Sequence, residues 1–262
     1  MNNVKKYLIS IEQPESPRLT NFFAQSTFSR YQSEFIQCGV IGADLPTREY
    51  FKLAVAGRKK PLSPAELGCT LSHLEALKNF LSTDEKYACI FEDDAISLKD
   101  FDLNSLETEI SQLNLKECFF FSLGGIQLKS NQRVRGTLLD QQINEKQILQ
   151  LHPLYFGRFF YTYAYVVDRK MAELLLQYHQ PPKGCDHWSQ ITNYDPNCNF
   201  YATFLFDHPE LDQIATGQSY IEQERQSIGL EQSKNKSFFL RLKISILKKF
   251  YNIFLNQYKK IN

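Results

Sequence analysis

The stretch Tyr87-Ala-Cys-Ile-Phe-Glu-Asp-Asp-Ala95 governs how the rest of the chain is interpreted. Its apolar run, residues 88–91, is short and ends at three consecutive acids, Glu92, Asp93 and Asp94. This pattern predicts a buried strand of an α/β sheet. In open sheets of this class, ligands bind beyond the carboxyl ends of the strands, which is where these acids fall.

Three adjacent carboxylates repel one another, and a fold that gathers them often does so for a cation. Mg²⁺ and Mn²⁺ take oxygen ligands and commonly bridge carboxylates to substrate phosphates. In an extended chain Glu92 and Asp94 point to the same side. The sequence therefore predicts a Mn²⁺ or Mg²⁺ site at this strand end. The alternative is a charged loop without a metal.

On either side of this strand the chain alternates apolar runs with helical patterns. Strands are predicted at residues 7–11, 39–43, 118–123, 159–167 and 200–206, and helices at 18–37, 63–82 and 168–178. The helix at 63–82 has the clearest signal, because Ser63-Pro-Ala-Glu66 is a capping box with Pro at the first helical position. Residues 131–150 predict a loop or a small hairpin. The alternation indicates an α/β sheet with helices on both faces.

Composition is that of a globular protein with a distinct tail. The 262 residues are 43% apolar and 14% aromatic, which is ample for one large α/β domain or two small ones. The formal net charge is +1, but residues 232–262 hold eight Lys/Arg and no acids. The rest therefore holds 22 basic and 29 acidic residues, a net charge of −7. We expect a catalytic domain over residues 1–225 and a basic tail over 226–262.

The cysteines and the N-terminus predict the cellular compartment of the protein. The six cysteines lack C-x-x-C spacing, and several fall in apolar runs, so they predict buried thiols in a reducing compartment and not a disulfide framework or a zinc site: Cys38, Cys69, Cys89, Cys118, Cys185 and Cys198. The N-terminus has no signal-peptide pattern, and no apolar run approaches the length of a membrane span. A cytoplasmic protein is expected.

Two common nucleotide-binding motifs are absent from the sequence. There is no Walker A loop and no G-x-G-x-x-G, so neither a P-loop enzyme nor a dinucleotide dehydrogenase is indicated.

Three other stretches point to a family. Glu66-Leu-Gly-Cys-Thr-Leu-Ser-His73 is followed by Glu92-Asp-Asp94, and later by Ala164-Tyr-Val-Val-Asp-Arg-Lys-Met-Ala-Glu-Leu-Leu175. This resembles the family 25 glycosyltransferases of bacterial lipopolysaccharide and lipooligosaccharide synthesis, whose pattern is E-x-G-C-x-x-S-H, then E-D-D, then an A-Y pair before a helix. The resemblance covers roughly residues 4–221.

The resemblance implies a GT-A-like nucleotide-sugar fold: a mixed sheet flanked by helices. It also implies a UDP-hexose donor, galactose or glucose, and an inverting transfer to a saccharide hydroxyl of lipooligosaccharide. The acids of residues 92–94 then occupy the place of the metal-binding D-x-D motif. Asp94 is the expected direct ligand of Mn²⁺ or Mg²⁺, with Glu92 beside it and Asp93 near the donor.

Two polar residues of the predicted helix are candidates for catalysis. Glu66 and His73 are seven residues apart and share a helical face that is not the leucine face. They would form a wall of the site. The alternatives are a Glu66 that only caps the helix and a His73 that supports the fold through hydrogen bonds.

The loop Pro181-Pro-Lys-Gly-Cys-Asp-His-Trp188 offers a base and an acceptor platform. An inverting transfer needs a carboxylate to take the proton of the attacking hydroxyl, and Asp186 is our choice. Trp188 would stack on an acceptor sugar. The alternatives are a turn-forming aspartate and a tryptophan of the core.

The remaining candidates follow predicted strands. His208 could add a histidine to the metal, by analogy with other GT-A enzymes. Ser10 and Arg18 are expected to contact the nucleotide. The alternative is that they belong to the loop structure and that Arg18 is solvated. Gly124 permits close approach of the backbone to a ligand, or makes a turn.

The tail is basic and apolar with a partial helical period. A basic amphipathic helix predicts binding to an anionic membrane surface, which would bring a lipid-linked acceptor within reach at the inner face of the cytoplasmic membrane. The alternative is packing on the body or on another subunit. Nucleic acid is not expected, because the basic excess is confined to the tail.

Two rival functions remain open. One is a metal-dependent nucleotidyltransferase, which also clusters acids at a strand end but releases pyrophosphate from a nucleoside triphosphate. The other is a non-catalytic carbohydrate-binding or membrane-peripheral protein.

Overall fold

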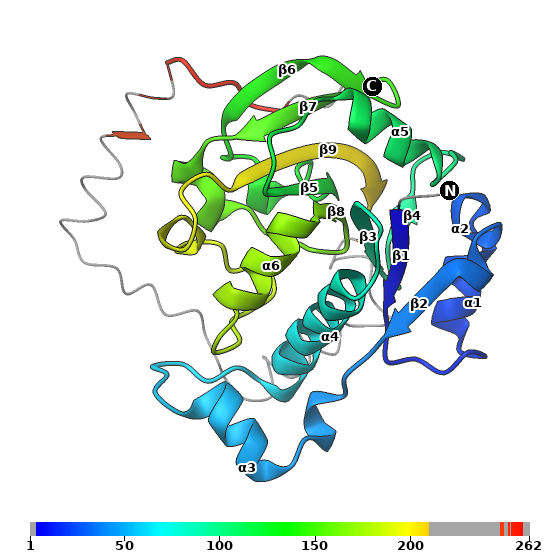
Figure 1. Ribbon diagram of the computed structural model, residues 1–262, viewed down its shortest axis with the longest axis vertical. Coiled ribbons are helices and arrows are strands. Elements are labelled where there is room, and N and C mark those ends of the chain that lie inside the picture. The colour runs from blue at the N-terminus through cyan, green and yellow to red at the C-terminus, as the bar shows by residue number, and fades with distance from the viewer. Residues whose placement is uncertain (1–3, 210–246, 249–250, 252, 259–262) are drawn as a thin grey trace.

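The computed structural model describes residues 4–209, 247–248, 251 and 253–258 (Figure 1). Nine strands of these residues form one mixed sheet in the order β2-β1-β3-β8-β5-β9-β7-β6, with β4 paired to β9. The strands are β1 Val4–Ile9, β2 Phe35–Cys38, β3 Tyr87–Glu92, β4 Ile96–Ser97, β5 Phe119–Gly124, β6 Gly136–Ile143, β7 Lys146–Leu151, β8 Ala164–Asp168 and β9 Asn199–Asp207.

Helices cover both faces of the sheet, as predicted. They are α1 Pro17–Ala24, α2 Ser26–Ser29, α3 Thr47–Tyr50, α4 Pro64–Leu81, α5 Ser105–Gln112 and α6 Arg169–Tyr178. Strand β3 shows why both faces are covered: Ala88 and Ile90 belong to the core under α4 and α6, while Cys89 and Phe91 belong to the core under α1, α2 and α5. The period of two along a fully buried strand supplies apolar side chains to both layers. The α/β fold class is confirmed.

Helix α4 begins where its capping box predicts. The Ser63 side chain accepts a hydrogen bond from the Glu66 backbone N–H at 3.2 Å, and the Glu66 carboxylate accepts one from the Ser63 N–H at 2.9 Å. Two otherwise unpaired N–H groups of the first turn are thereby satisfied. Helices α4 and α6 lie side by side on one face of the sheet in Figure 1.

The predicted helix over residues 18–37 is wrong in its length. The chain leaves the helix at Gln25, whose backbone is extended, and after α2 and a 3₁₀ turn it enters strand β2. The Gln25 side chain donates to the Ala95 carbonyl at 3.0 Å and accepts from the Ser97 N–H at 2.7 Å. These long-range hydrogen bonds stabilise the break, which a helical pattern of aromatic residues does not reveal.

The second strand is also displaced from its predicted place. Strand β2 ends at Cys38, and the predicted strand at 39–43 is instead a loop followed by a 3₁₀ turn, Gly42–Asp44. A Cβ at Gly42 would lie 1.9 Å from the Pro64 carbonyl oxygen, so the glycine lets this loop approach the start of α4. Likewise, the strand predicted at 159–167 begins only at Ala164.

The predicted hairpin at 131–150 is confirmed by the antiparallel pair β6 and β7. Helix α5 was not predicted. The predicted boundary near residue 226 and most of the predicted basic helix fall outside the described residues. Of the tail, Asn256 pairs with Gly136 at the start of β6, and Leu255 and Tyr258 pack against the core.

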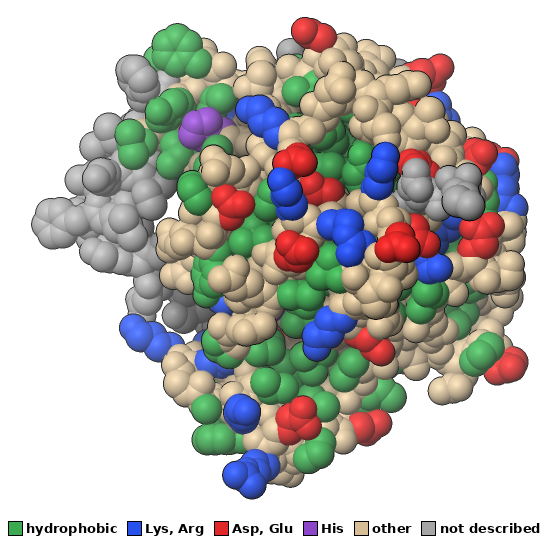
Figure 2. All heavy atoms as spheres, in the orientation of Figure 1, with side chains coloured by type: hydrophobic (Ala, Val, Ile, Leu, Met, Phe, Trp, Pro, Cys, Tyr) green, Lys and Arg blue, Asp and Glu red, His purple; other side chains and the backbone are tan. Residues whose placement is uncertain are grey.

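The surface in Figure 2 shows acidic and basic side chains interspersed over this face of the molecule. Among the helices that the structure describes, none is both long and apolar enough to cross a membrane.

Candidate active site

Strands β1 and β3 are parallel neighbours whose last residues, Ile9 and Glu92, stand in register. Their carboxyl ends therefore meet at one edge of the sheet, and the residues that follow them meet as well. Ser10 donates a hydrogen bond from Oγ to Asp93 Oδ2 at 2.5 Å. The acids are thus held at the edge where ligands of α/β proteins bind.

Arg18 lies in the first turn of α1, a helix that begins after the capping residue Ser16. Its guanidinium donates from Nε to Asp93 Oδ1 at 2.8 Å, from Nη2 to the same oxygen, and from Nη2 to Asp94 Oδ2 at 3.3 Å. Burial raises the pKa of Asp93 in spite of this cation and the Ser10 hydroxyl. The planar guanidinium of Arg18 thus contacts two acidic side chains at once.

His208 reaches the acids because β4 pairs with β9. Ile96 stands opposite Asp207, so the residue after β9 lies beside the residues before β4. His208 Nε2 is 3.3 Å from Asp94 Oδ2, and its Nδ1 hydrogen-bonds with the Pro209 carbonyl at 2.8 Å. A carbonyl only accepts, so Nδ1 carries a proton and Nε2 is the nitrogen presented to Asp94.

Asp94 is the most distinctive carboxylate of this edge. Burial alone would raise its pKa, but the hydrogen bond and charge of His208 and the charge of Arg18 hold the pKa of Asp94 below its usual value. The same pairing raises the pKa of His208 against the opposing effect of burial. Asp94 Oδ1 is buried and has no hydrogen-bond partner among the residues that the structure describes. A buried acceptor without a partner is costly and marks a place for a ligand.

A cleft of about 270 Å³ opens beside these acids. Arg18 and residues 92–94 line one part of it, and α4 contributes Ala65, Cys69 and Ser72. Two half-exposed apolar side chains, Ile11 at 40% and Ile41 at 45%, stand at its rim. The cleft combines a polar, charged floor with an apolar rim, the usual composition of a small-molecule site.

Residues 92–94 do not act as one cluster. Strand β3 ends at Glu92, and a turn closed by the Ala95 N–H to the Glu92 carbonyl follows, so the extended geometry that would put Glu92 and Asp94 on one side is absent. Glu92 Oε1 lies 3.2 Å from His73 Nε2 and accepts from the Thr162 hydroxyl at 2.9 Å. Glu92 therefore faces α4 while Asp94 faces His208.

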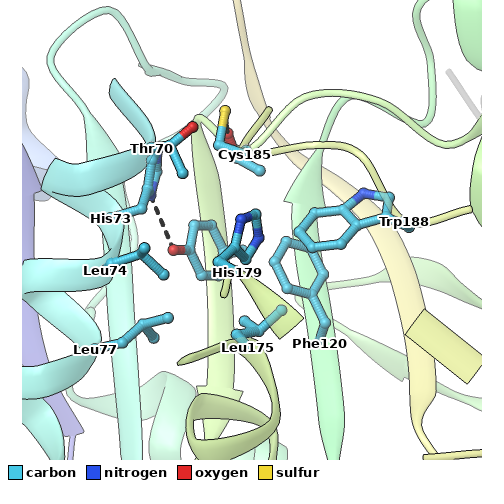
Figure 3. A pocket seen from close by; sticks show the side chains of 11 residues that line it. Thr70, His73, Leu74, Leu77, Phe120, Leu175, His179, Cys185 and Trp188 are labelled. Atoms are coloured by element: carbon cyan, nitrogen blue, oxygen red, sulfur yellow. Dashed lines mark hydrogen bonds between the residues drawn. The ribbon is translucent and has the colours of Figure 1, made fainter. Parts of the chain in front are cut away.

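His73 is buried, 4% exposed, and its Nδ1 forms a hydrogen bond of 2.9 Å with the Tyr165 hydroxyl (Figure 3). Together with the Glu92 contact, this fixes the imidazole at both nitrogens. Glu66, by contrast, caps its helix, and the cleft is lined by its neighbour Ala65. The pairing of Glu66 with His73 as one wall of the site does not occur.

Asp186 contacts Tyr161, a residue whose ring lies near His208. The Tyr161 backbone N–H donates to Asp186 Oδ2 at 3.3 Å, and the Tyr161 ring centroid is 6.0 Å from that of His208. The carboxylate predicted as the base is thereby tied to the segment that borders the acids.

Two predicted site residues serve the core instead. Trp188 is 2% exposed and packs against both Phe120 and Phe200, at centroid distances of 5.1 and 5.3 Å, so it presents no open face to a sugar. A Cβ at Gly124 would lie 2.3 Å from both the Phe206 carbonyl oxygen and the Tyr163 hydroxyl. Protein atoms occupy the space beside this glycine, and the predicted approach to a cofactor does not fit.

Sequence reasoning missed Thr162, Cys185 and Tyr161 as neighbours of the site. Cys69 belongs to the family motif at residues 66–73, which is the sequence signal that points to it. Its partner Cys185 is 116 residues away and has no such signal. Only the fold brings them together, with sulfur atoms 3.7 Å apart.

Known proteins resemble this chain in sequence and, more weakly, in structure. The model of glycosyltransferase family 25 (LPS biosynthesis protein) matches residues 3–188. The search of curated proteins found no match. Two solved structures are loosely similar. A197 from STIV has a TM-score of 0.37 and 13% identity over 79% of this chain and 85% of its own. Mannose-1-phosphate geranyltransferase from Thermus thermophilus has a TM-score of 0.36 and 8% identity over 78% and 76%. At these TM-scores neither carries an argument about this chain.

Proposed function

Because this chain belongs to glycosyltransferase family 25 (LPS biosynthesis protein), we propose that it transfers a hexose, galactose or glucose, from a UDP-sugar to a saccharide hydroxyl of lipooligosaccharide, with inversion, on a GT-A-like fold. The observation that carries the proposal is Asp94, just after the carboxyl end of β3, with one buried oxygen that has no hydrogen-bond partner among the described residues and with His208 on the other oxygen. This pair lies beside a cleft large enough for part of a nucleotide sugar.

A divalent cation, Mn²⁺ or Mg²⁺, fits this pair. In the described part of the chain Asp94 Oδ1 has no hydrogen-bond partner and is available as an oxygen ligand. His208 Nδ1 is occupied by a carbonyl, so Nε2 is the nitrogen that would bind a metal. Glu92, which lines the same cleft, is the further carboxylate within this edge. When bound, the cation would neutralise charge on the departing UDP.

The donor diphosphate would lie against Arg18. Its guanidinium already balances Asp93 and Asp94, and its side chain is 37% exposed, so it can contact an anion from the cleft. Ser10 and Asp93 then act by holding Arg18 in place, since both belong to the same hydrogen-bonded group. Positioning and charge compensation of this kind are the main contributions of a protein to transfer from a nucleotide.

The base would be Asp186. Inversion requires a carboxylate that accepts the proton of the acceptor hydroxyl while the hydroxyl attacks the sugar. Asp186 is held by the Tyr161 N–H on the side of His208, and its loop precedes the buried Trp188. His73 and Glu92 form a hydrogen-bonded pair that borders this site and would support it.

The basic tail would bring the enzyme to the anionic inner face of the cytoplasmic membrane, where a lipid-linked acceptor is found. In the described part of the tail, Ile253 and Phe254 are 75% and 70% exposed, which suits an interfacial contact. The pairing of Asn256 with Gly136 favours the alternative, a tail that packs on the body, for that part of the chain.

The deciding experiment measures UDP release from UDP-galactose and from UDP-glucose separately, with truncated lipooligosaccharide as acceptor, in Mn²⁺ or EDTA. We expect metal-dependent release from one donor and its loss in Asp94→Asn. The matched control is Asp140→Asn, an exposed carboxylate of β6. Pyrophosphate release from a nucleoside triphosphate would favour the nucleotidyltransferase. Sugar binding without any turnover would favour the non-catalytic protein.

A further inference from the structure

A second group of metal-binding atoms lies around His73, the residue that contacts Glu92. Cys69 and His73 are four residues apart on α4 and therefore share a helical face. Cys185 comes from the loop after α6 and directly precedes Asp186. The two sulfurs and one imidazole nitrogen all lie within 4.8 Å of one another.

The distance between the two sulfurs matches a tetrahedral zinc site. Zinc binds thiolate sulfur at about 2.3 Å, so two sulfurs on one tetrahedral zinc lie about 3.8 Å apart. The sulfurs of Cys69 and Cys185 are 3.7 Å apart. A hydrogen bond between two thiols has a similar length, but it does not require a histidine at the same point.

His73 is held in the manner of a zinc ligand. The Thr162 hydroxyl contacts both Glu92 Oε1, at 2.9 Å, and Cys185 Sγ, at 3.4 Å. Because His73 Nε2 also contacts Glu92 Oε1, Nε2 is the imidazole nitrogen that lies toward Cys185. The other nitrogen, Nδ1, forms a hydrogen bond with the Tyr165 hydroxyl, which can donate or accept and so permits either tautomer. A hydrogen-bond partner on the nitrogen that faces away from the metal is the usual arrangement for ligating histidines.

The surroundings suit a neutral metal complex. His73 is buried and the two cysteines are half-buried. Zinc with two thiolates and a neutral imidazole has no net charge, which limits the cost of burying it.

We propose that Cys69, His73 and Cys185 bind one zinc ion through two thiolates and His73 Nε2. Binding displaces the two thiol protons to solvent and oxidises nothing; the imidazole proton moves from Nε2, where it faces the Glu92 carboxylate, to Nδ1, where it is donated to the Tyr165 hydroxyl oxygen. A water would complete the tetrahedral ligand set and keep the complex neutral, and the Glu92 carboxylate beside His73 could accept a hydrogen bond from it. The prediction from spacing alone, that the cysteines bind no zinc, is thereby revised.

The ion would join helix α4 to the loop that carries Asp186. In Figure 3, Thr70, His73 and Cys185 meet at one end of a small cavity, whose other end is closed by Leu77, Leu175 and Phe120. Besides the zinc ligands, the link between loop and helix includes the Thr70 hydroxyl, which donates to the Lys183 carbonyl at 2.9 Å. A zinc ion adds a much stronger link, one residue from Asp186.

The test uses the full chain, incubated with zinc chloride under reducing conditions, desalted, and analysed for metal by mass spectrometry. We expect one zinc per chain, retained in Asp94→Asn and Cys198→Ala and lost in Cys69→Ala and Cys185→Ala. Cys198 is the matched control, a buried cysteine outside the group. Substitution with Co²⁺ should produce the thiolate charge-transfer absorption of a tetrahedral site.

A second measurement needs no variant. Titration of the zinc-loaded chain with a mercurial reagent should release one zinc to a chromogenic chelator as two thiols react. Zinc content unchanged in the Cys69 and Cys185 variants, no zinc in the wild-type chain, or a Cys69–Cys185 disulfide in its peptide map would overturn the proposal. None of these readouts involves a UDP-sugar, so the outcome is independent of the proposed transferase activity.

Discussion

Asp94 Oδ2 lies 3.3 Å from His208 Nε2 because the short pair of β4 with β9 brings the two strand ends together. The acid follows one buried strand and the histidine follows the last, so neither is a sequence neighbour of the other. This relationship places a buried oxygen and an oriented imidazole beside the cleft, and the first prediction tests it.

His208→Ala should weaken metal binding and retain some activity at saturating metal. The variant removes one proposed ligand and leaves Asp94 in place, so the Mn²⁺ concentration for half-maximal UDP release should rise by about 10- to 100-fold. A metal titration of UDP release measures it. An unchanged Mn²⁺ requirement would remove His208 from the metal site and leave it as a partner of Asp94 only.

Arg18→Lys should raise the KM for the UDP-sugar by about tenfold, because a single ammonium cannot replace a fork that contacts two carboxylates and still faces the cleft. Donor titration of initial rates measures it. Arg30→Lys is the control, since Arg30 makes an exposed ion pair with Asp100. Equal KM values for the wild type and Arg18→Lys would show that the donor does not contact this side chain.

Asp186→Asn should lower kcat by about 10²- to 10⁴-fold with little change in donor affinity, because the amide oxygen can still accept from the Tyr161 N–H but cannot take a proton. The measurements are kcat for transfer and calorimetric binding of UDP. A variant whose donor affinity falls together with kcat would indicate that the loop has moved and that Asp186 only supports it.

Trp188→Phe should cost about 1 to 3 kcal/mol of unfolding free energy and leave the KM for the acceptor unchanged. The ring loses contacts with Phe120 and Phe200. The loss of Nε1, which is buried and has no hydrogen-bond partner in the described part of the chain, offsets part of that cost. Urea unfolding and acceptor titration are the two measurements. A large rise in acceptor KM with unchanged stability would instead support the hypothesis that Trp188 stacks on an acceptor sugar.

The buried thiol of Cys89 should make the folded protein less stable at alkaline pH. Burial raises the pKa of this thiol to about 12 in the folded chain, against 9.0 as its ordinary value. Between these pH values the unfolded chain loses a proton that the folded chain keeps. The free energy of unfolding therefore falls as the pH rises, by about 1.4 kcal/mol per pH unit for this one group.

Cys89→Ala lacks this group, so its stability deficit relative to the wild type should be largest below pH 9 and should shrink above it. Urea unfolding of both proteins at about pH 8, 9 and 10 measures the difference. A deficit that stays constant across this range would contradict the assigned pKa.

The local pattern of the sequence was sufficient for most elements. The strand before Glu92, the capped helix from Pro64 to Leu81 and the hairpin of β6 and β7 are where periodicity and turn chemistry predict them. The prediction from the local pattern failed at Gln25, where hydrogen bonds to residues 95 and 97 end a helix that the aromatic pattern would continue. A local pattern carries no information about partners so far along the chain.

Short-range patterns in the chain were enough for the fold class, the family and the acids at the end of β3, because these depend on periodicity and on a contiguous motif. Tertiary contacts were needed to establish which atoms meet: Asp94 with His208, Glu92 with His73, and Cys69 with Cys185. They also placed Trp188 in the core. Each of these results depends on strand order and loop path, which bring together residues whose separation in sequence leaves no periodic signal.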